Sequence, residues 1–244
     1  MKHLIFLRLK RYIPQYIIFT FLILLVIYAK STTIPLYENM EIDKYFWEIN
    51  LSFNSISLMD GIIALILLIT PYAFIQIAFG NILYYDTSTN GSLIFTRYRS
   101  KKKYFILFMT ELFIHMLILV ILTFLIGCFL LNFIDYDLIF NHESWKFLIK
   151  NFYEVYASYL SVAFITNFLT FVIQDLIKAS IFFNTLIICS LIFMNYIKNL
   201  FLFKLIPILT PIIYEEYTII ISFLEITIIL SATFYFINRK EFYN

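Results

Sequence analysis

Six long apolar runs most restrict what this chain of 244 residues can fold into. A helix needs about 20 apolar residues to cross a hydrocarbon core of about 30 Å, because each residue adds about 1.5 Å. In lipid, a helix satisfies every backbone hydrogen bond internally. The runs lie at 12–29, 59–83, 104–133, 152–173, 181–197 and 217–237. The sequence therefore predicts an all-α, polytopic membrane protein with six transmembrane helices.

The composition supports lipid as the solvent of this chain. Hydrophobic residues make up 62% of it and charged residues 14%, whereas soluble domains average roughly 45–50% and about 25%. We find no internal repeat, and the longest stretch between apolar runs, 30–58, is too short for a separate domain. We therefore interpret 1–244 as a single transmembrane domain. The basic start, 1–11, is interpreted as an interfacial segment and not as a cleaved signal, because no small-residue cleavage site follows it.

The distribution of basic residues predicts the orientation. Twelve of the 18 Lys and Arg residues fall at the two ends of the chain or in the loops after the second and fourth runs. Short loops on the cytoplasmic side of a membrane are enriched in Lys and Arg, so both termini are predicted to be cytoplasmic. The apolar stretch 199–216 is broken by Pro207 and Pro211, and we expect it to form an extracellular re-entrant hairpin.

The loop 84–104 is the most informative segment between the runs. Asn90-Gly91 is a turn signal, and Ser92 is placed to cap a short helix. Apolar residues and then a basic cluster follow. Two interpretations stay open from the residues alone: a short helix that docks onto a cytoplasmic partner, or a loop whose basic residues bind anionic lipid.

The order of residues in this loop resembles the permease subunits of ABC-2-type transporters, of the compact kind that accompanies bacteriocin and other peptide exporters in Gram-positive bacteria. An acidic residue, a glycine, a few apolar residues, an arginine and a basic stretch precede the next span. The matching positions are Asp86, Gly91, Leu93, Arg97, Arg99, Ser100 and Lys101. In that family this cytoplasmic coupling loop rests in a groove of the ATPase subunit. The six spans, the cytoplasmic termini and the broken hairpin are similar as well.

The resemblance implies a transport subunit and not an enzyme. No glycine is followed by lysine, so a phosphate-binding P-loop is absent. ATP and Mg are therefore expected on a partner, a cytoplasmic ATPase in two copies, and no cofactor in this chain. A second permease copy or a homologous permease, the lipid bilayer and a bacterial cytoplasmic membrane are also implied, without a nucleic acid. Amphipathic or hydrophobic peptides are the expected substrates.

Polar residues inside the runs are further candidates, because polar groups within a membrane avoid lipid. In the fourth run they recur at steps of three or four residues and so share one face of a helix. Together with Glu225 of the last run, they line either a substrate path or a packed helix contact. These candidates are Tyr156, Tyr159, Asn167, Thr170, Gln174 and Glu225.

Glu111 and His115 lie four residues apart in the third run, so their side chains are close enough to touch. They form either a gate or a packed structural pair. A zinc site needs a further ligand, and none is evident, so no metal site is expected.

Three other classes of membrane protein compete with the transporter. Membrane CAAX-type proteases use Glu-Glu-x-x-x-Arg with histidines in the spans, but the arginine is missing after Glu215-Glu216, and we reject this class. A non-transporting bacteriocin-immunity or membrane-assembly protein has the same hydropathy but no need of an ATPase dock. A proton-coupled carrier predicts repeats and several buried ionisable residues, of which only Glu111, His115 and Glu225 are apparent.

Overall fold

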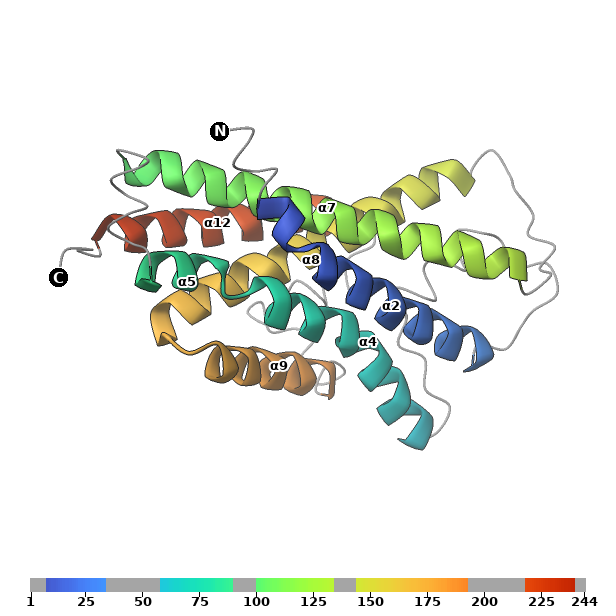
Figure 1. Cartoon of the computed structure of the whole chain (residues 1–244). Coiled ribbons are helices and arrows are strands. Elements are labelled where there is room, and N and C mark those ends of the chain that lie inside the picture. Colours follow the sequence, from blue (N-terminus) through green and yellow to red (C-terminus); the bar gives the residue numbers. More distant parts are fainter. Residues whose placement is uncertain (1–7, 34–57, 90–99, 134–143, 193–217, 240–244) are drawn as a thin grey trace.

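The computed structural model describes residues 8–33, 58–89, 100–133, 144–192 and 218–239 (Figure 1). Every regular element in these ranges is a helix, which confirms the all-α prediction for the described part. The helices are α2 (Ile13–Thr33), α4 (Leu58–Phe79), α5 (Ile82–Thr89), α7 (Lys101–Phe133), α8 (Ser144–Ile173), α9 (Leu176–Ile192) and α12 (Thr218–Arg239).

Within the described residues, four helical stretches are long and apolar enough to cross a membrane. They are Ile13–Lys30, Ile66–Ser88, Lys101–Leu130 and Leu148–Ile173, and α9 carries a shorter apolar stretch, Leu176–Cys189. Each of the six predicted runs overlaps a helix, although the boundaries differ. The predicted coupling loop begins in a helix and not in a loop, since α5 extends to Thr89.

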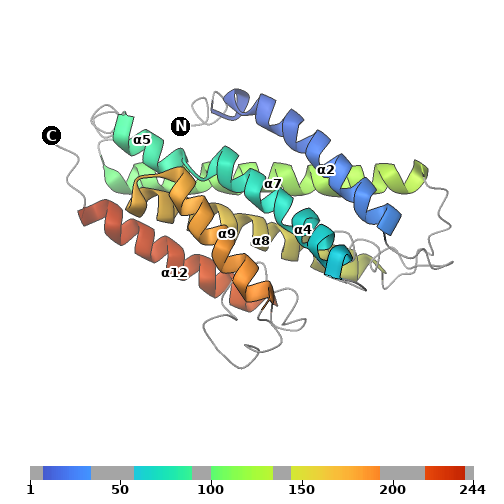
Figure 2. The ribbon, with the colours of Figure 1, turned by 90° about the horizontal axis from the view of Figure 1, so that it is seen from below.

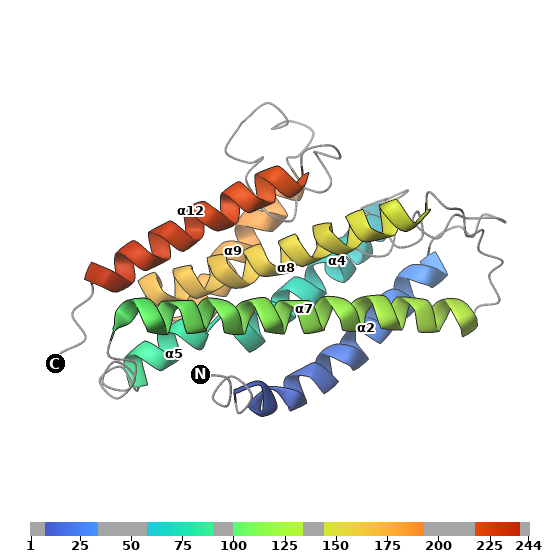
Figure 3. The same ribbon diagram turned by 90° about the horizontal axis from the view of Figure 1, so that it is seen from above.

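Helix α8 lies at the centre of the bundle. It packs against α4, α5, α7, α9 and α12, and α2 packs against α4 and α7 on the other side. The two turned views agree that α2 and α12 lie on opposite sides, with α7 and α8 between them (Figures 2 and 3). The end of α5, the start of α7, the turn from α8 to α9 and the end of α12 gather at one end of the bundle (Figure 1).

Two kinds of apolar surface result from this packing. The side chains of Phe19, Ile75, Phe79, Phe108 and Phe164 are almost fully buried where α2, α4, α7 and α8 meet. Large apolar side chains also point outward, among them Ile17, Phe21, Ile177, Phe182 and Phe223. An outward apolar face this extensive is costly in water and favourable in lipid.

Candidate functional site

The candidate site begins with the break between α4 and α5. Gly80 and Asn81 form a turn there, and a side chain at Gly80 has no room. A Cβ added to Gly80 would lie 2.5 Å from Thr166 Cγ2 of α8 and 2.3 Å from the carbonyl oxygen of Gln76. The glycine therefore lets α8 approach the break closely, and α5 resumes beyond it.

Asn167 of α8 satisfies the backbone groups that this break exposes. Its Oδ1 accepts a hydrogen bond from the N–H of Leu83 at 3.0 Å. Its Nδ2 donates to the carbonyl oxygens of Phe79, at 2.7 Å, and of Ala163, at 2.8 Å. The side chain is fully buried, so these bonds replace contacts that water cannot make. We call this arrangement the amide contact.

Arg8 brings α5 and α7 together just beyond the break. The same nitrogen, Nη1, lies 2.8 Å from Asp86 Oδ2 of α5 and 2.7 Å from Glu111 Oε2 of α7. The Arg8 side chain is 20% exposed, that of Asp86 13% and that of Glu111 1%. One guanidinium thus bridges two carboxylates that come from different helices.

Hydrogen bonds extend this bridge in both directions. The hydroxyl of Tyr104, at the start of α7, donates to Asp86 Oδ2 at 3.2 Å. On the other side, His115 Nε2 lies 3.7 Å from Glu111 Oε1, and His115 Nδ1 forms a hydrogen bond with the hydroxyl of Tyr16. We call these six residues the charge cluster: Arg8, Tyr16, Asp86, Tyr104, Glu111 and His115.

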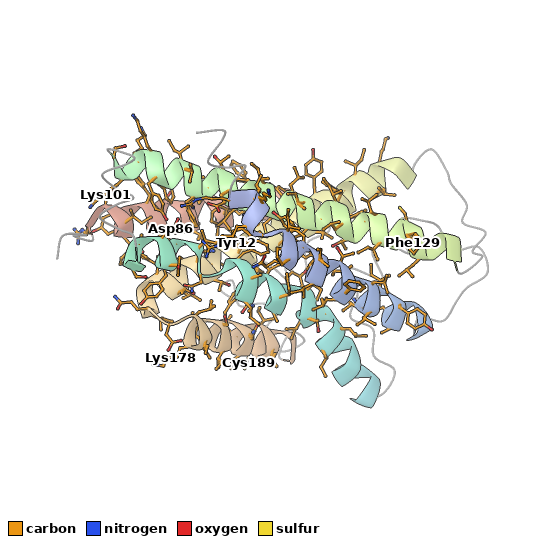
Figure 4. All side chains as sticks on the ribbon, viewed as in Figure 1. Tyr12, Asp86, Lys101, Phe129, Lys178 and Cys189 are labelled. Carbon is orange, nitrogen blue, oxygen red and sulfur yellow. The ribbon has the colours of Figure 1, made fainter. Side chains whose placement is uncertain are left out.

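Aromatic rings enclose the histidine side of the charge cluster. The ring of Tyr12 meets His115 edge-on at 4.6 Å between centroids, and the ring of Phe79 lies 4.9 Å from His115. Tyr12 and Phe79 stack on each other at 5.3 Å. Figure 4 places Tyr12 and Asp86 in the half of the molecule that also holds Lys101 and Lys178, away from Phe129.

The electrostatics favour a charged arginine. Burial lowers the pKa of Arg8, but the neighbouring Glu111 and Asp86 carboxylates raise it, and the net effect is a pKa above the ordinary value. The guanidinium therefore stays protonated at any physiological pH.

The predicted coupling residues fall into three groups. Asp86 lies in the charge cluster, where Arg8 and Tyr104 occupy its carboxylate. Ser100 caps α7, because its Oγ accepts a hydrogen bond from the N–H of Lys103 at 3.1 Å, and Lys101 Nζ donates to the carbonyl oxygen of Asn238 at 3.1 Å. The other four, Gly91, Leu93, Arg97 and Arg99, lie outside the described residues, as does the hairpin 199–216.

The predicted path residues do not all share one face. Tyr159, Asn167 and Thr170 are buried on α8, and the hydroxyl of the half-buried Tyr156 donates to the carbonyl oxygen of Phe113. Gln174 stands apart, because it is exposed in the turn between α8 and α9 with φ 62°. Glu225 is buried on α12, which packs against α8.

The gate candidates Glu111 and His115 are brought together, with side chains 1% and 0% exposed. The part of the chain that the structure describes holds no group of three His, Cys, Asp or Glu residues placed to bind a metal ion.

The sequence analysis did not identify two buried charged residues, Lys30 and Glu154, or the half-buried Arg8. Arg8 was counted only as part of a basic segment, and Lys30 only as a loop residue, yet the Lys30 side chain is 6% exposed. Glu154, within the fourth predicted span, is 3% exposed and lies 3.8 Å from Lys150. The spacing of four residues between Lys150 and Glu154 is the signal that would have indicated this pair.

No protein-family model matches the chain, and no match appears among curated proteins or solved structures. The structure itself therefore defines the class. The described part of the chain is all-helical and holds four helices long and apolar enough to cross a membrane, which indicates a membrane-embedded protein.

Proposed function

We propose that this chain is the membrane-spanning permease subunit of an ABC-2-type exporter in a bacterial cytoplasmic membrane. In this proposal six helices cross the bilayer and both termini are cytoplasmic. Two cytoplasmic ATPase subunits bind ATP and Mg and dock on the loop between α5 and α7. A second permease, identical or homologous, completes the transport route, and amphipathic or hydrophobic peptides are the substrates.

The charge cluster is the observation that carries this proposal. The proposed docking loop, 84–104, begins within α5, which ends at Thr89, and ends within α7, which begins at Lys101. Arg8 links both of these helices to the segment that leads into α2. A displacement of the loop would therefore move α5, α7 and the start of α2 together, as coupling to an ATPase requires.

The amide contact supports the same interpretation. The helix is interrupted at Gly80 and Asn81, so α5 is a short helix of eight residues that is separate from α4. Asn167 holds both sides of this interruption on α8, the central helix. A loop movement carried by α5 would therefore reach the helix that packs against most of the bundle.

The test is co-purification of the chain with a candidate ATPase from detergent. The wild type is compared with Gly91→Pro/Arg97→Glu, which disrupts the proposed docking helix. Lys178→Glu is the matched control, since it also reverses a charge at this end of the bundle, in the first turn of α9, where the lysine is 75% exposed.

We expect the ATPase to bind the wild type and Lys178→Glu, and to be lost from the loop variant. Equal binding to all three proteins would remove the loop from the docking surface. Binding to none of them would favour the alternative function, that of a bacteriocin-immunity or membrane-assembly protein.

A proton-coupled carrier is the second candidate, and one observation favours it. Lys30 and Glu154 are buried in addition to Glu111, His115 and Glu225, and buried ionisable groups in membranes often bind or relay protons. Uptake of protons with a solute by liposomes that contain this chain alone would support the carrier. Transport that requires both ATP and a partner ATPase would exclude it.

A further inference from the structure

The two carboxylates of the charge cluster belong to the helical bundle, whereas the cation between them comes from the segment before α2. We propose that Asp86 and Glu111 form a guanidinium-binding site, that Arg8 is its resident occupant, and that the same site binds an arginine side chain of a peptide when Arg8 withdraws. The peptide part deepens the proposed function and rests on it. The binding site itself does not, because it belongs to this chain alone.

Contacts that do not involve Arg8 also hold the two carboxylates in place. Asp86 accepts a hydrogen bond from Tyr104, and Asp86 lies on α5, which Asn167 anchors through the N–H of Leu83. Glu111 is 1% exposed in the middle of a continuous helix, α7. Withdrawal of Arg8 would therefore leave two carboxylates fixed on separate helices and short of one positive charge.

His115 gives independent evidence that this place is built for a ligand. Its Nε2 atom is fully buried and has no hydrogen-bond partner among the described residues. It lies 3.7 Å from Glu111 Oε1, too far for a hydrogen bond. A buried polar atom that faces a carboxylate across such a gap is costly in a purely structural contact.

The surroundings select guanidinium among cations. A guanidinium is planar, carries five N–H donors and is weakly hydrated, so it loses less than an ammonium when it enters a partly dry site. The aromatic rings of Tyr12 and Phe79 border the cluster. Both carboxylates contact the same nitrogen of Arg8, so the other guanidinium nitrogens are not needed for these two ion pairs.

Arg8 is the exchangeable member of the cluster. At 20% it is the most exposed of the three ion-paired side chains, and Arg8 precedes the start of α2 at Ile13. Arg11, three residues further, lies over the ring of Tyr85 at 5.7 Å. It is not bonded to either carboxylate in the structure, so it serves as a matched control.

The experiment uses the purified full chain in detergent without an ATPase. Arg8→Ala and Arg11→Ala are titrated with N-acetyl-arginine amide and, as the neutral isostere, with N-acetyl-citrulline amide. Binding is measured by isothermal titration calorimetry and by thermal unfolding. We expect the arginine compound to bind Arg8→Ala saturably. It should bind Arg11→Ala and the wild type, in which Arg8 occupies the site, at least about tenfold more weakly. The citrulline compound should not bind.

The variant Arg8→Ala/Glu111→Gln completes the test. It should bind the arginine compound at least about tenfold more weakly than Arg8→Ala, because one charge-assisted bond is lost. Equal binding by these two variants, or equal effects of the arginine and citrulline compounds, would overturn the site. The outcome does not depend on ATPase co-purification, so a failure here leaves the proposed exporter standing.

A second measurement covers the case in which Arg8→Ala does not remain folded. The variant is then purified in the presence of each compound, and the monodisperse fraction is measured by size-exclusion chromatography. Recovery with the arginine compound alone supports the site. Recovery with both compounds, or with neither, overturns it.

Discussion

The charge cluster and the amide contact hold the same short helix, α5, by different means. Arg8 binds α5 through the Asp86 carboxylate, and Arg8 belongs to a segment outside the central bundle and is partly exposed. Asn167 binds α5 through the N–H of Leu83, and Asn167 is fully buried within the central helix α8. The charged contact is suited to exchange of its partner, whereas the neutral contact is suited to a permanent anchor.

The physical reason is the cost of opening each contact. When Arg8 withdraws, its guanidinium is accessible to water, and another cation is able to replace it beside Asp86 and Glu111. When the amide of Asn167 is removed, the backbone groups of Phe79 and Leu83 have no water to replace it. The two contacts therefore have different roles because one of them has a route to solvent.

The largest expected effect comes from reversing the charge in the exchangeable contact. Arg8→Glu would place a third carboxylate against Asp86 and Glu111, and should lower the free energy of unfolding by about 3 kcal/mol. This is the lower end of the range for breaking a buried ion pair, because Arg8 is partly exposed. Unfolding in denaturing detergent measures this. Arg11→Glu, the control, should change it by less than about 1 kcal/mol. Similar losses in both variants would show that the cluster is not a specific contact.

A smaller loss is expected from the neutral contact. Asn167→Leu leaves the N–H of Leu83 and the carbonyl of Phe79 without their partner, and should cost about 2 kcal/mol in the same unfolding measurement. The matched control is Thr170→Val, one turn further along α8, because Thr170 Oγ1 is buried without a hydrogen-bond partner among the described residues. This control should be neutral or slightly stabilising. If Asn167→Leu were as mild as the control, the break between α4 and α5 would not depend on the amide.

The smallest effect concerns a carboxylate at the surface, Asp175, which serves as an exposed reference for the carboxylates Asp86 and Glu111. Its Oδ1 accepts hydrogen bonds from the N–H groups of Ile177, at 2.9 Å, and Lys178, at 3.1 Å, and so caps α9. The pKa of Asp175 is lowered below its ordinary value, and the hydrogen bond from the backbone N–H of Lys178 is the main cause.

A lowered pKa means that this stabilisation is fully present above the ordinary Asp range and is lost as the pH falls through the folded-state value. The melting temperature of Asp175→Asn should therefore be slightly below that of the wild type near neutral pH, and the difference should vanish in acid. A difference that does not change with pH would mean that the carboxylate charge contributes nothing to the cap.

The helices were predictable and the charge cluster was not. A run such as 104–133 is predominantly apolar, and lipid or a dry interior forces its backbone to be helical, so α7 was expected almost to the residue. The helix α8 begins earlier than predicted, at Ser144, because its first turns contain charged residues that hydropathy excludes from a span but that favour helix. Asn167 was predicted as a polar residue on an inward face, but its hydrogen bonds to the break were not.

The sequence by itself determined that the helices are suited to lipid, and it determined the secondary structure. Both depend on hydropathy and helical length, which are properties of residues that are neighbours along the chain. It also brought Glu111 and His115 together, since four residues make one turn of a helix. Only the tertiary structure decided that Arg8 binds Asp86 and Glu111, the latter 103 residues away. Such a pairing depends on the depth and direction at which separate helices pack, and no local pattern of residues carries that information.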